Sequence, residues 1–231
     1  MEIFFLLAAL ILSIIVHEVA HGAMADYLGD HTARYAGRLT FNPIRHFDFM
    51  GSFLVPLLCF LLPTRLVFGW AKPVPINPYN FRDQKYGSLK VAFAGPGSNL
   101  LVASFFGLVG RFLPLTAGER ISIFNSFNNF LGSFRTPETL METGFVGMLF
   151  FFFLIIIFIN VLLAIVNLIP IPPLDGSHIL FTFLPKVEYK FKEFAARSGI
   201  MVLPLMILAI YFVLPLAFTA IYFVFRVISG V

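Results

Sequence analysis

Long runs of apolar residues, separated by shorter polar segments, make up most of the 231-residue chain. Five such blocks occupy residues 3–25, 49–62, about 88–113, 143–169 and 198–228. Several of them approach or exceed the ~20 apolar residues that cross a bilayer as one helix. The pattern predicts an all-α polytopic membrane protein with about four to six transmembrane segments. No internal repeat divides the sequence, so residues 1–231 are expected to form a single membrane-embedded domain.

The block at residues 49–62 differs from the others because it is short and contains Pro56. Pro63 and Arg65 follow it directly. A segment of this kind is expected to enter and leave the membrane on one side, as a re-entrant hairpin. The block at 198–228 is long for one helix and contains two prolines, so one tilted helix and a helix with a half-helix are both open.

Two loop segments favour strands over helices. Residues 38–41 (RLTF) and 71–77 (AKPVPIN) are rich in Thr, Val, Pro and Asn at spacings that disfavour a helix. We therefore expect short membrane-associated strands close to the functional site. Ordinary surface loops are the alternative.

Composition supports the membrane class and excludes several others. Hydrophobic residues make up 59% of the chain and charged residues 12%, against about 25% charged residues in soluble domains. The net charge of +4 arises from basic residues scattered through loops, so the lipid bilayer is an expected partner and nucleic acid is not. Cys59 is the only cysteine, which excludes an intrachain disulfide and a thiolate metal cluster.

The most informative motif is His17-Glu18-Val19-Ala20-His21, inside the first apolar block. On a helix, His17 and His21 lie on one face, so both imidazoles can reach one metal ion. Glu18 can then face a metal-bound water, as the general base does in zinc metalloproteases. A pair of histidines that pack between helices is the alternative, but ionisable groups are costly inside a membrane and mark functional sites.

A catalytic zinc usually has three protein ligands and a water, so a third ligand must be found elsewhere in the chain. The metzincin position, six residues after the second histidine, is Tyr27, and the next glutamate is Glu119 in a polar loop. His31 and His46 lie in loops with basic neighbours, where we expect solvated side chains.

Asp175 is the remaining candidate, in the segment NLIPIPPLDGSH directly after the fourth apolar block. Prolines in this segment stop the preceding helix, and Gly176 permits a tight turn. A carboxylate held at this break would complete a His/His/Asp site, whereas the alternative is an ordinary Asp-Gly turn at the membrane surface. His178 is a second candidate, either as a ligand or as a group that supports the ligands.

Together these motifs resemble the site-2 protease family of intramembrane zinc metalloproteases. The HExxH motif stands at residues 17–21, and N-x-x-P…LDG runs from Asn167 to Gly176. The segment from Gly95 to Asn99 (GPGSN) is similar to the family's third motif, G-x-x-x-N. All three occur in order, and the sequence shows no PDZ or cystathionine-synthase-like domain, so the resemblance is to the small members of the family.

The resemblance implies that His17, His21 and Asp175 hold zinc and that Glu18 activates water. It also implies that Asn99 is catalytic and lies near the scissile peptide, where its amide would stabilise the oxyanion or hold the substrate strand. The alternative for Asn99 is a hydrogen bond between helices within the G-x-x-x-N face.

The resemblance also implies an intramembrane endopeptidase whose substrate is a transmembrane or membrane-proximal segment of another protein. Such a substrate must present extended backbone, because a helix engages its carbonyls in hydrogen bonds, and residues 71–77 are suited to pair with it. We expect Asn167 to brace the LDG turn by bonding carbonyls that the prolines leave free.

Closing the metal site imposes a rule on topology. The two histidines lie toward the C-terminal end of the first apolar block, and Asp175 lies at the C-terminal end of the fourth. These two ends would fall on opposite membrane sides if every block between them crossed. With residues 49–62 re-entrant, twelve Lys and Arg lie on the zinc side and four on the other. The positive-inside rule then predicts an integral multi-pass protein of the cell membrane, with its active site nearer the cytoplasm.

Two other functions compete with proteolysis. A di-iron lipid hydroxylase of the histidine-box type needs more histidines than the five present. A non-catalytic membrane transporter or scaffold would use zinc structurally, but such a site has no use for Glu18 as a base.

Overall fold

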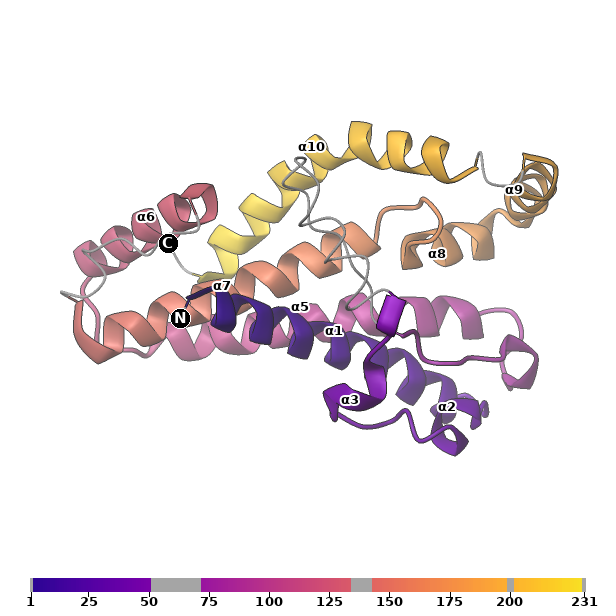
Figure 1. The fold of residues 1–231 in the computed structure, drawn as a ribbon, viewed down its shortest axis with the longest axis horizontal. Helices are drawn as coiled ribbons and strands as arrows, with labels where there is room; N and C mark the ends of the chain where they lie inside the picture. Colours follow the sequence, from indigo (N-terminus) through magenta and orange to yellow (C-terminus); the bar gives the residue numbers. More distant parts are fainter. Residues whose placement is uncertain (1, 51–71, 134–142, 199–201, 230–231) are drawn as a thin grey trace.

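The computed structural model describes residues 2–50, 72–133, 143–198 and 202–229, and this part of the chain is a bundle of helices (Figure 1). Three of the described helices are long and apolar enough to cross a membrane: α1 (Glu2–Tyr27), α5 (Gly87–Arg111) and α7 (Gly144–Asn167). The remaining elements are α2 (Thr32–Tyr35), α3 (Pro43–His46), the 3₁₀ helix η2 (Pro78–Asn80), α6 (Ala117–Ser133), α8 (Asp175–Phe183), α9 (Pro185–Ser198) and α10 (Val202–Ser229). The all-α prediction is confirmed for this part of the chain, and three apolar helices are consistent with a polytopic membrane protein; the expected total of four to six segments stays a prediction.

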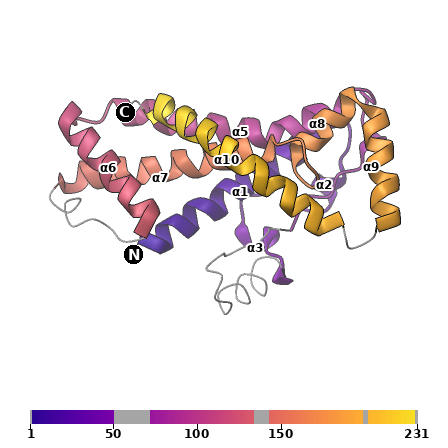
Figure 2. The same ribbon diagram turned by 90° about the horizontal axis from the view of Figure 1, so that it is seen from above.

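The two ends of the bundle carry different elements. Both termini and α6 lie at one end, and α2, α8 and α9 lie at the other (Figures 1 and 2). We call these the α6 end and the α8 end. α5 runs antiparallel to α1, because its residues 91 and 99 contact residues 21 and 17 of α1 in that order. α7 runs parallel to α1, so both helices finish at the α8 end.

Aromatic packing holds the bundle together toward the α6 end. Phe127 and Phe130 of α6, Phe150 and Phe151 of α7, and Phe225 of α10 are each exposed by 1% or less. The rings of Phe127, Phe130, Phe151 and Phe225 meet edge-on or tilted, in the arrangements that aromatic quadrupoles favour. The last apolar block, whose form was open from the sequence, is the single helix α10 with Pro215 inside it.

α1 ends in a Schellman motif that turns the chain sharply at the α8 end. Gly29 adopts φ +108°, which a residue with a Cβ rarely reaches. Its N–H donates to the carbonyl of Asp26 and the N–H of Asp30 donates to that of Ala25, which satisfies carbonyls at the helix terminus. The polar segment after α1 therefore starts at a fixed position.

The segment that contains the predicted re-entrant hairpin starts and finishes at the α8 end. The N–H of Lys72 donates to the carbonyl of His46 at 3.0 Å, and the N–H of Arg82 donates to the carbonyl of Leu28 at 2.8 Å. The described flanks of the hairpin thus lie beside the end of α1 and the start of α5, as the topology rule requires. Residues 51–62 of the hairpin lie outside the described residues.

The strands expected near the site do not form within the described part of the chain. Residues 38–41 and 72–77 are irregular there, because their backbone groups bond to other partners. Pro73 and Pro75 have no N–H, and the guanidinium of Arg38 occupies the carbonyls of Lys72 and Pro73. The sequence shows that these residues favour extended backbone. It does not show that, among the described residues, neither segment has a neighbouring strand with which to form hydrogen bonds.

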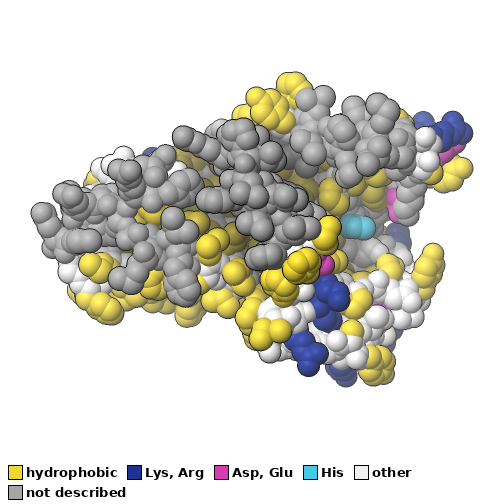
Figure 3. Space-filling view, viewed as in Figure 1, with side chains coloured by type: hydrophobic (Ala, Val, Ile, Leu, Met, Phe, Trp, Pro, Cys, Tyr) yellow, Lys and Arg dark blue, Asp and Glu magenta, His cyan; other side chains and the backbone are white. Residues whose placement is uncertain are grey.

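Basic residues concentrate at the α8 end, as the charge count predicted. Figure 3 shows Lys and Arg mainly on the right-hand half of the visible face, around a hollow in which a histidine surface is exposed. The α8 end carries the basic positions 34, 38, 45, 72, 82, 85, 90, 186, 190 and 197, and the α6 end carries 111, 120 and 226.

This arrangement predicts which loops share a membrane face. Single cysteines replacing Ala36 and Tyr79, in a Cys59→Ala background, should react with a membrane-impermeant maleimide from the same side. A cysteine replacing Gly118 should react only from the opposite side. All three positions are exposed. Labelling of positions 36 and 79 from opposite sides would contradict the described topology.

Candidate metal centre

Three side chains from distant parts of the chain converge at the α8 end. His17 and His21 project from α1, and Asp175 is the first residue of α8. The two Nε2 atoms are 3.0 Å apart, and they lie 3.0 and 3.2 Å from Oδ2 of Asp175. Among the described residues, this is the one group of His, Cys, Asp and Glu with three potential metal donors close together.

The other ring nitrogens fix how the two imidazoles face the centre. Nδ1 of His21 lies 2.7 Å from the carbonyl oxygen of Val91, and Nδ1 of His17 lies 2.6 Å from Oδ1 of Asn99. A carbonyl oxygen only accepts, so both Nδ1 atoms carry the proton in the neutral rings. The Nε2 atoms therefore direct lone pairs at Asp175.

Three potential donor atoms this close form a group that could hold a metal ion. Two imidazole lone pairs and a carboxylate repel one another, and both histidines are more than 90% buried from solvent that would screen the repulsion. Zinc ligands at 2.0–2.2 Å in a tetrahedron lie about 3.3 Å from each other, close to the separations found here. The donor set of two nitrogens and one oxygen fits zinc with one position left for water.

Two glycines allow the backbone to approach this centre. A Cβ on Gly95 would collide with the rings of His21 and His17, so only glycine lets α5 pack against them. A Cβ on Gly176 would collide with the carbonyls of Leu168 and Ile169. The expected tight turn at Gly176 is wrong, because this residue lies in α8; the glycine is explained by close packing of α8 on the end of α7.

A cavity of about 430 Å³ opens beside the three donors. Glu18 lines it, and its Oε2 accepts a hydrogen bond of 2.9 Å from the N–H of Val74. Asn167 and His178 also line the cavity. His178 is exposed and lies outside the three-donor group.

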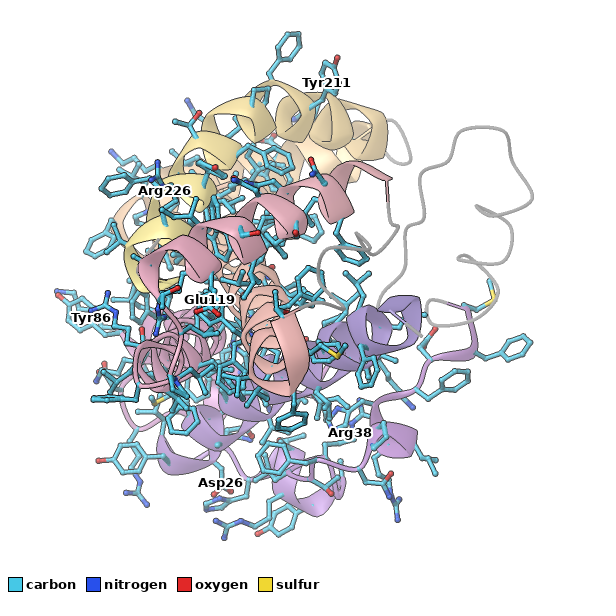
Figure 4. All side chains as sticks on the ribbon, turned by 90° about the vertical axis from the view of Figure 1, so that its left-hand side faces the viewer. Asp26, Arg38, Tyr86, Glu119, Tyr211 and Arg226 are labelled. Carbon is cyan, nitrogen blue, oxygen red and sulfur yellow. The ribbon has the colours of Figure 1, made fainter. Side chains whose placement is uncertain are left out.

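Residues 72–77, which we call the strap, form one wall of this cavity. Arg38 is 7% exposed and donates to the carbonyls of Lys72 at 2.5 Å and Pro73 at 3.3 Å, as well as to that of Arg45. Figure 4 shows Arg38 among the segments after α1, whereas Tyr211 and Arg226 lie on the outside of α10. The first part of the strap is therefore held by a buried cation.

Asp30 holds the other end of the strap. Its carboxylate is fully buried and accepts from the N–H of Asn77 at 2.7 Å and from Nδ2 of Asn80 at 2.9 Å. Burial raises the pKa of this carboxyl, but hydrogen bonds from Thr32, Asn77 and Asn80 outweigh burial and lower the pKa below its ordinary value. The strap is thus fixed on both sides of the Val74 N–H that contacts Glu18.

The two asparagines expected at the site occupy unlike surroundings. Asn99 has no exposed surface; its Oδ1 accepts from His17, and its Nδ2 donates to Oδ1 of Asn160 and the carbonyl of Ser13. Asn167 donates to the carbonyl of Leu163, one turn back in α7, where a bond to the proline-rich turn was expected.

Sequence reasoning missed four contributors: Ser13, Arg38, Val74 and Asn160. A signal existed for Asn160, because it is a polar residue within α7, whose most apolar window has a mean hydropathy of 3.2. Arg38 carried no such signal, since arginine in a loop is normally solvated.

Comparisons with known proteins agree on one family. The model of the family described as "Peptidase family M50" matches residues 5–211. The protein named "Putative zinc metalloprotease YwhC" of Bacillus subtilis is 35% identical over 182 residues, covering 78% of this chain and 69% of the relative. "Protease RseP" of Photorhabdus luminescens is 38% identical over 149 residues, covering 53% and 65%. "Putative zinc metalloprotease Rip2" of Mycolicibacterium smegmatis is 28% identical over 203 residues, covering 87% and 66%. No solved structure gives a significant match.

The geometry predicts which substitutions release the metal. His17→Ala, His21→Ala and Asp175→Asn should each lower zinc binding by at least a hundredfold, because each removes one donor. His178→Ala should retain stoichiometric zinc. Metal analysis of the purified variants, with chelator competition for affinity, measures both effects. If the His178 variant loses zinc and the Asp175 variant retains it, His178 is the third ligand and Asp175 is not.

Proposed function

Because the chain belongs to peptidase family M50 and is a zinc-dependent metallopeptidase of the site-2 protease type, we propose that it hydrolyses peptide bonds within or next to transmembrane segments of other membrane proteins. The observation that carries this proposal is the convergence of His17, His21 and Asp175 at the ends of apolar helices.

Glu18 is the general base of the proposed reaction. Zinc held by the three donors would supply a Lewis acid that makes water acidic enough to be deprotonated near pH ~7. Glu18 follows His17 on α1 and lines the same cavity. The N–H of Val74 bonds one of its oxygens, which fixes the carboxylate and leaves the other oxygen to accept the proton.

Asn99 acts in this proposal by orienting His17, and not by contacting the peptide. It is fully buried, and both ends of its amide are engaged within the protein. His178 and Asn167, by contrast, line the cavity, which supports a role for them in contacting the substrate.

The strap supplies backbone groups for an extended substrate. Pro73 and Pro75 favour extended backbone in the residues before them. Val74 and Ile76 are two residues apart, so their N–H and C=O groups face one side of an extended segment, and the Val74 N–H points at Glu18. Pairing through Ile76 would hold a substrate backbone beside the three donors.

The zinc side faces the cytoplasm in this proposal, within the cell membrane. The support is the excess of Lys and Arg in loops at the α8 end, which the positive-inside rule assigns to the cytoplasmic side.

Removing the base should separate chemistry from metal binding. Glu18→Gln should retain zinc and lose at least ~10³-fold in proteolytic rate, because glutamine cannot accept the proton. Glu119→Gln, the same change at the α6 end, is the matched control and should leave activity unchanged. Substrates are sought as membrane peptides that appear with the wild-type protein and not with the Glu18 variant. Zinc lost together with activity would make Glu18 a ligand, and unchanged membrane peptides with zinc retained would favour a transporter or scaffold.

The strap hypothesis predicts a specific effect on substrate affinity. Ile76→Pro deletes one N–H and should raise KM up to about tenfold, since one hydrogen bond contributes roughly 0.5–1.5 kcal/mol. Ile76→Ala keeps the N–H and should change KM less. Zinc content should be normal in both variants. Equal KM values for the two variants would show that the backbone of Ile76 does not hold the substrate.

A further inference from the structure

A chain of buried polar groups continues behind the metal centre into the membrane-spanning core. It runs from His17 through Asn99 to Asn160 of α7, with Ser13 of α1 beside both asparagines. Both asparagines are completely buried and Ser13 is 5% exposed. Three spanning helices thus meet at amide and hydroxyl groups in an otherwise apolar region, where unsatisfied polar groups are costly.

Hydrogen-bond chemistry fixes the direction of this chain. Nδ2 of Asn160 donates to the carbonyl of Ile156 at 2.8 Å and to Oγ of Ser13 at 2.9 Å. A carbonyl only accepts, so the amine end of Asn160 must face it, and its Oδ1 must face Asn99. That Oδ1 accepts from Nδ2 of Asn99 at 2.8 Å.

The same argument extends to the metal ligand. The amine end of Asn99 is committed to Asn160 and to the carbonyl of Ser13 at 3.2 Å. Its Oδ1 therefore faces His17 and accepts from Nδ1–H at 2.6 Å. The Nε2 lone pair of His17 is left for the metal. A reversed Asn99 amide would face His17 with a donor and require the other tautomer, whose Nε2–H cannot bind a metal.

We propose that Asn160 is a positioning residue for the metal centre. Its backbone-anchored amide sets the orientation of Asn99, which sets the tautomer and the ring angle of His17. This inference rests on the proposed role of His17 as a zinc ligand. Groups that hold a ligand imidazole through its second nitrogen typically contribute 10- to 100-fold to metal affinity.

Asn160→Leu tests the proposal with little change in side-chain volume. We expect zinc affinity, measured by chelator competition, to fall 10- to 100-fold. We also expect ¹⁵N NMR of the histidine-labelled, metal-free variant at pH 8 to show both tautomers of His17, where the wild type shows Nδ1–H alone. The tautomer is a readout that a purely structural role of Asn160 would not change.

Two further variants separate positioning from stability. Leu154→Ala removes a fully buried side chain from the same helix and should lower thermal stability with zinc affinity unchanged. Asn160→Asp keeps an acceptor for Asn99 and should hold zinc within about threefold of wild type even if the buried charge lowers stability. A structural role would instead make zinc affinity follow stability across all three variants.

The outcomes also distinguish this inference from the proposed function. If His17→Ala loses zinc while Asn160→Leu keeps wild-type affinity and a single tautomer, the positioning role is wrong and the zinc site stands. If His17→Ala keeps zinc, His17 is not a ligand, and the positioning role of Asn160, which rests on that assignment, is also wrong. If Asn160→Leu does not fold, a tenfold or greater loss of affinity in a folded Asn160→Asp variant overturns the proposal.

Discussion

The arrangement of this protein depends on holding three electron-rich atoms within 3.2 Å of each other in a largely apolar region. Two imidazole lone pairs and a carboxylate this close repel one another, so the site favours a cation among them. Much of the local structure serves to maintain this convergence. Glycines at 95 and 176 remove the side chains that would keep α5 and α8 away. The carbonyl of Val91 and the amide of Asn99 hold the rings from behind.

The polar segments at the α8 end form a second layer of support. Arg38 and Asp30 are buried charged residues that hold the strap by its backbone, one at each end. Neither faces the metal centre directly. Their common effect is to place the N–H of Val74 against Glu18, so that the position of this carboxylate depends on loops as well as on α1. A buried charge is costly unless it is hydrogen-bonded, and both of these side chains are hydrogen-bonded to the strap.

The parts predicted from sequence were those that follow from periodicity and from ligand chemistry. The length of the apolar blocks predicted the spanning helices, and the four-residue spacing of His17 and His21 predicted that both side chains lie on one face of α1. Elimination led to Asp175, which the structure brings to both histidines. The parts that could not be predicted depend on pairing between distant residues. The sequence around Arg38 does not indicate that its guanidinium donates to the carbonyls of Lys72 and Pro73. Likewise, the strand-like composition of residues 72–77 does not reveal that side chains form hydrogen bonds with the backbone of this segment.

X-ray absorption spectroscopy at the zinc edge tests the central claim most directly. The purified protein in detergent should give a first shell of nitrogen and oxygen at 2.0–2.2 Å, with multiple scattering from two imidazoles per zinc. That result would correspond to His17, His21 and Asp175 with one further oxygen. A third imidazole would bring His178 or another histidine into the shell, and fewer than two imidazoles, or a sulfur at about 2.3 Å from Cys59, would contradict the assigned centre.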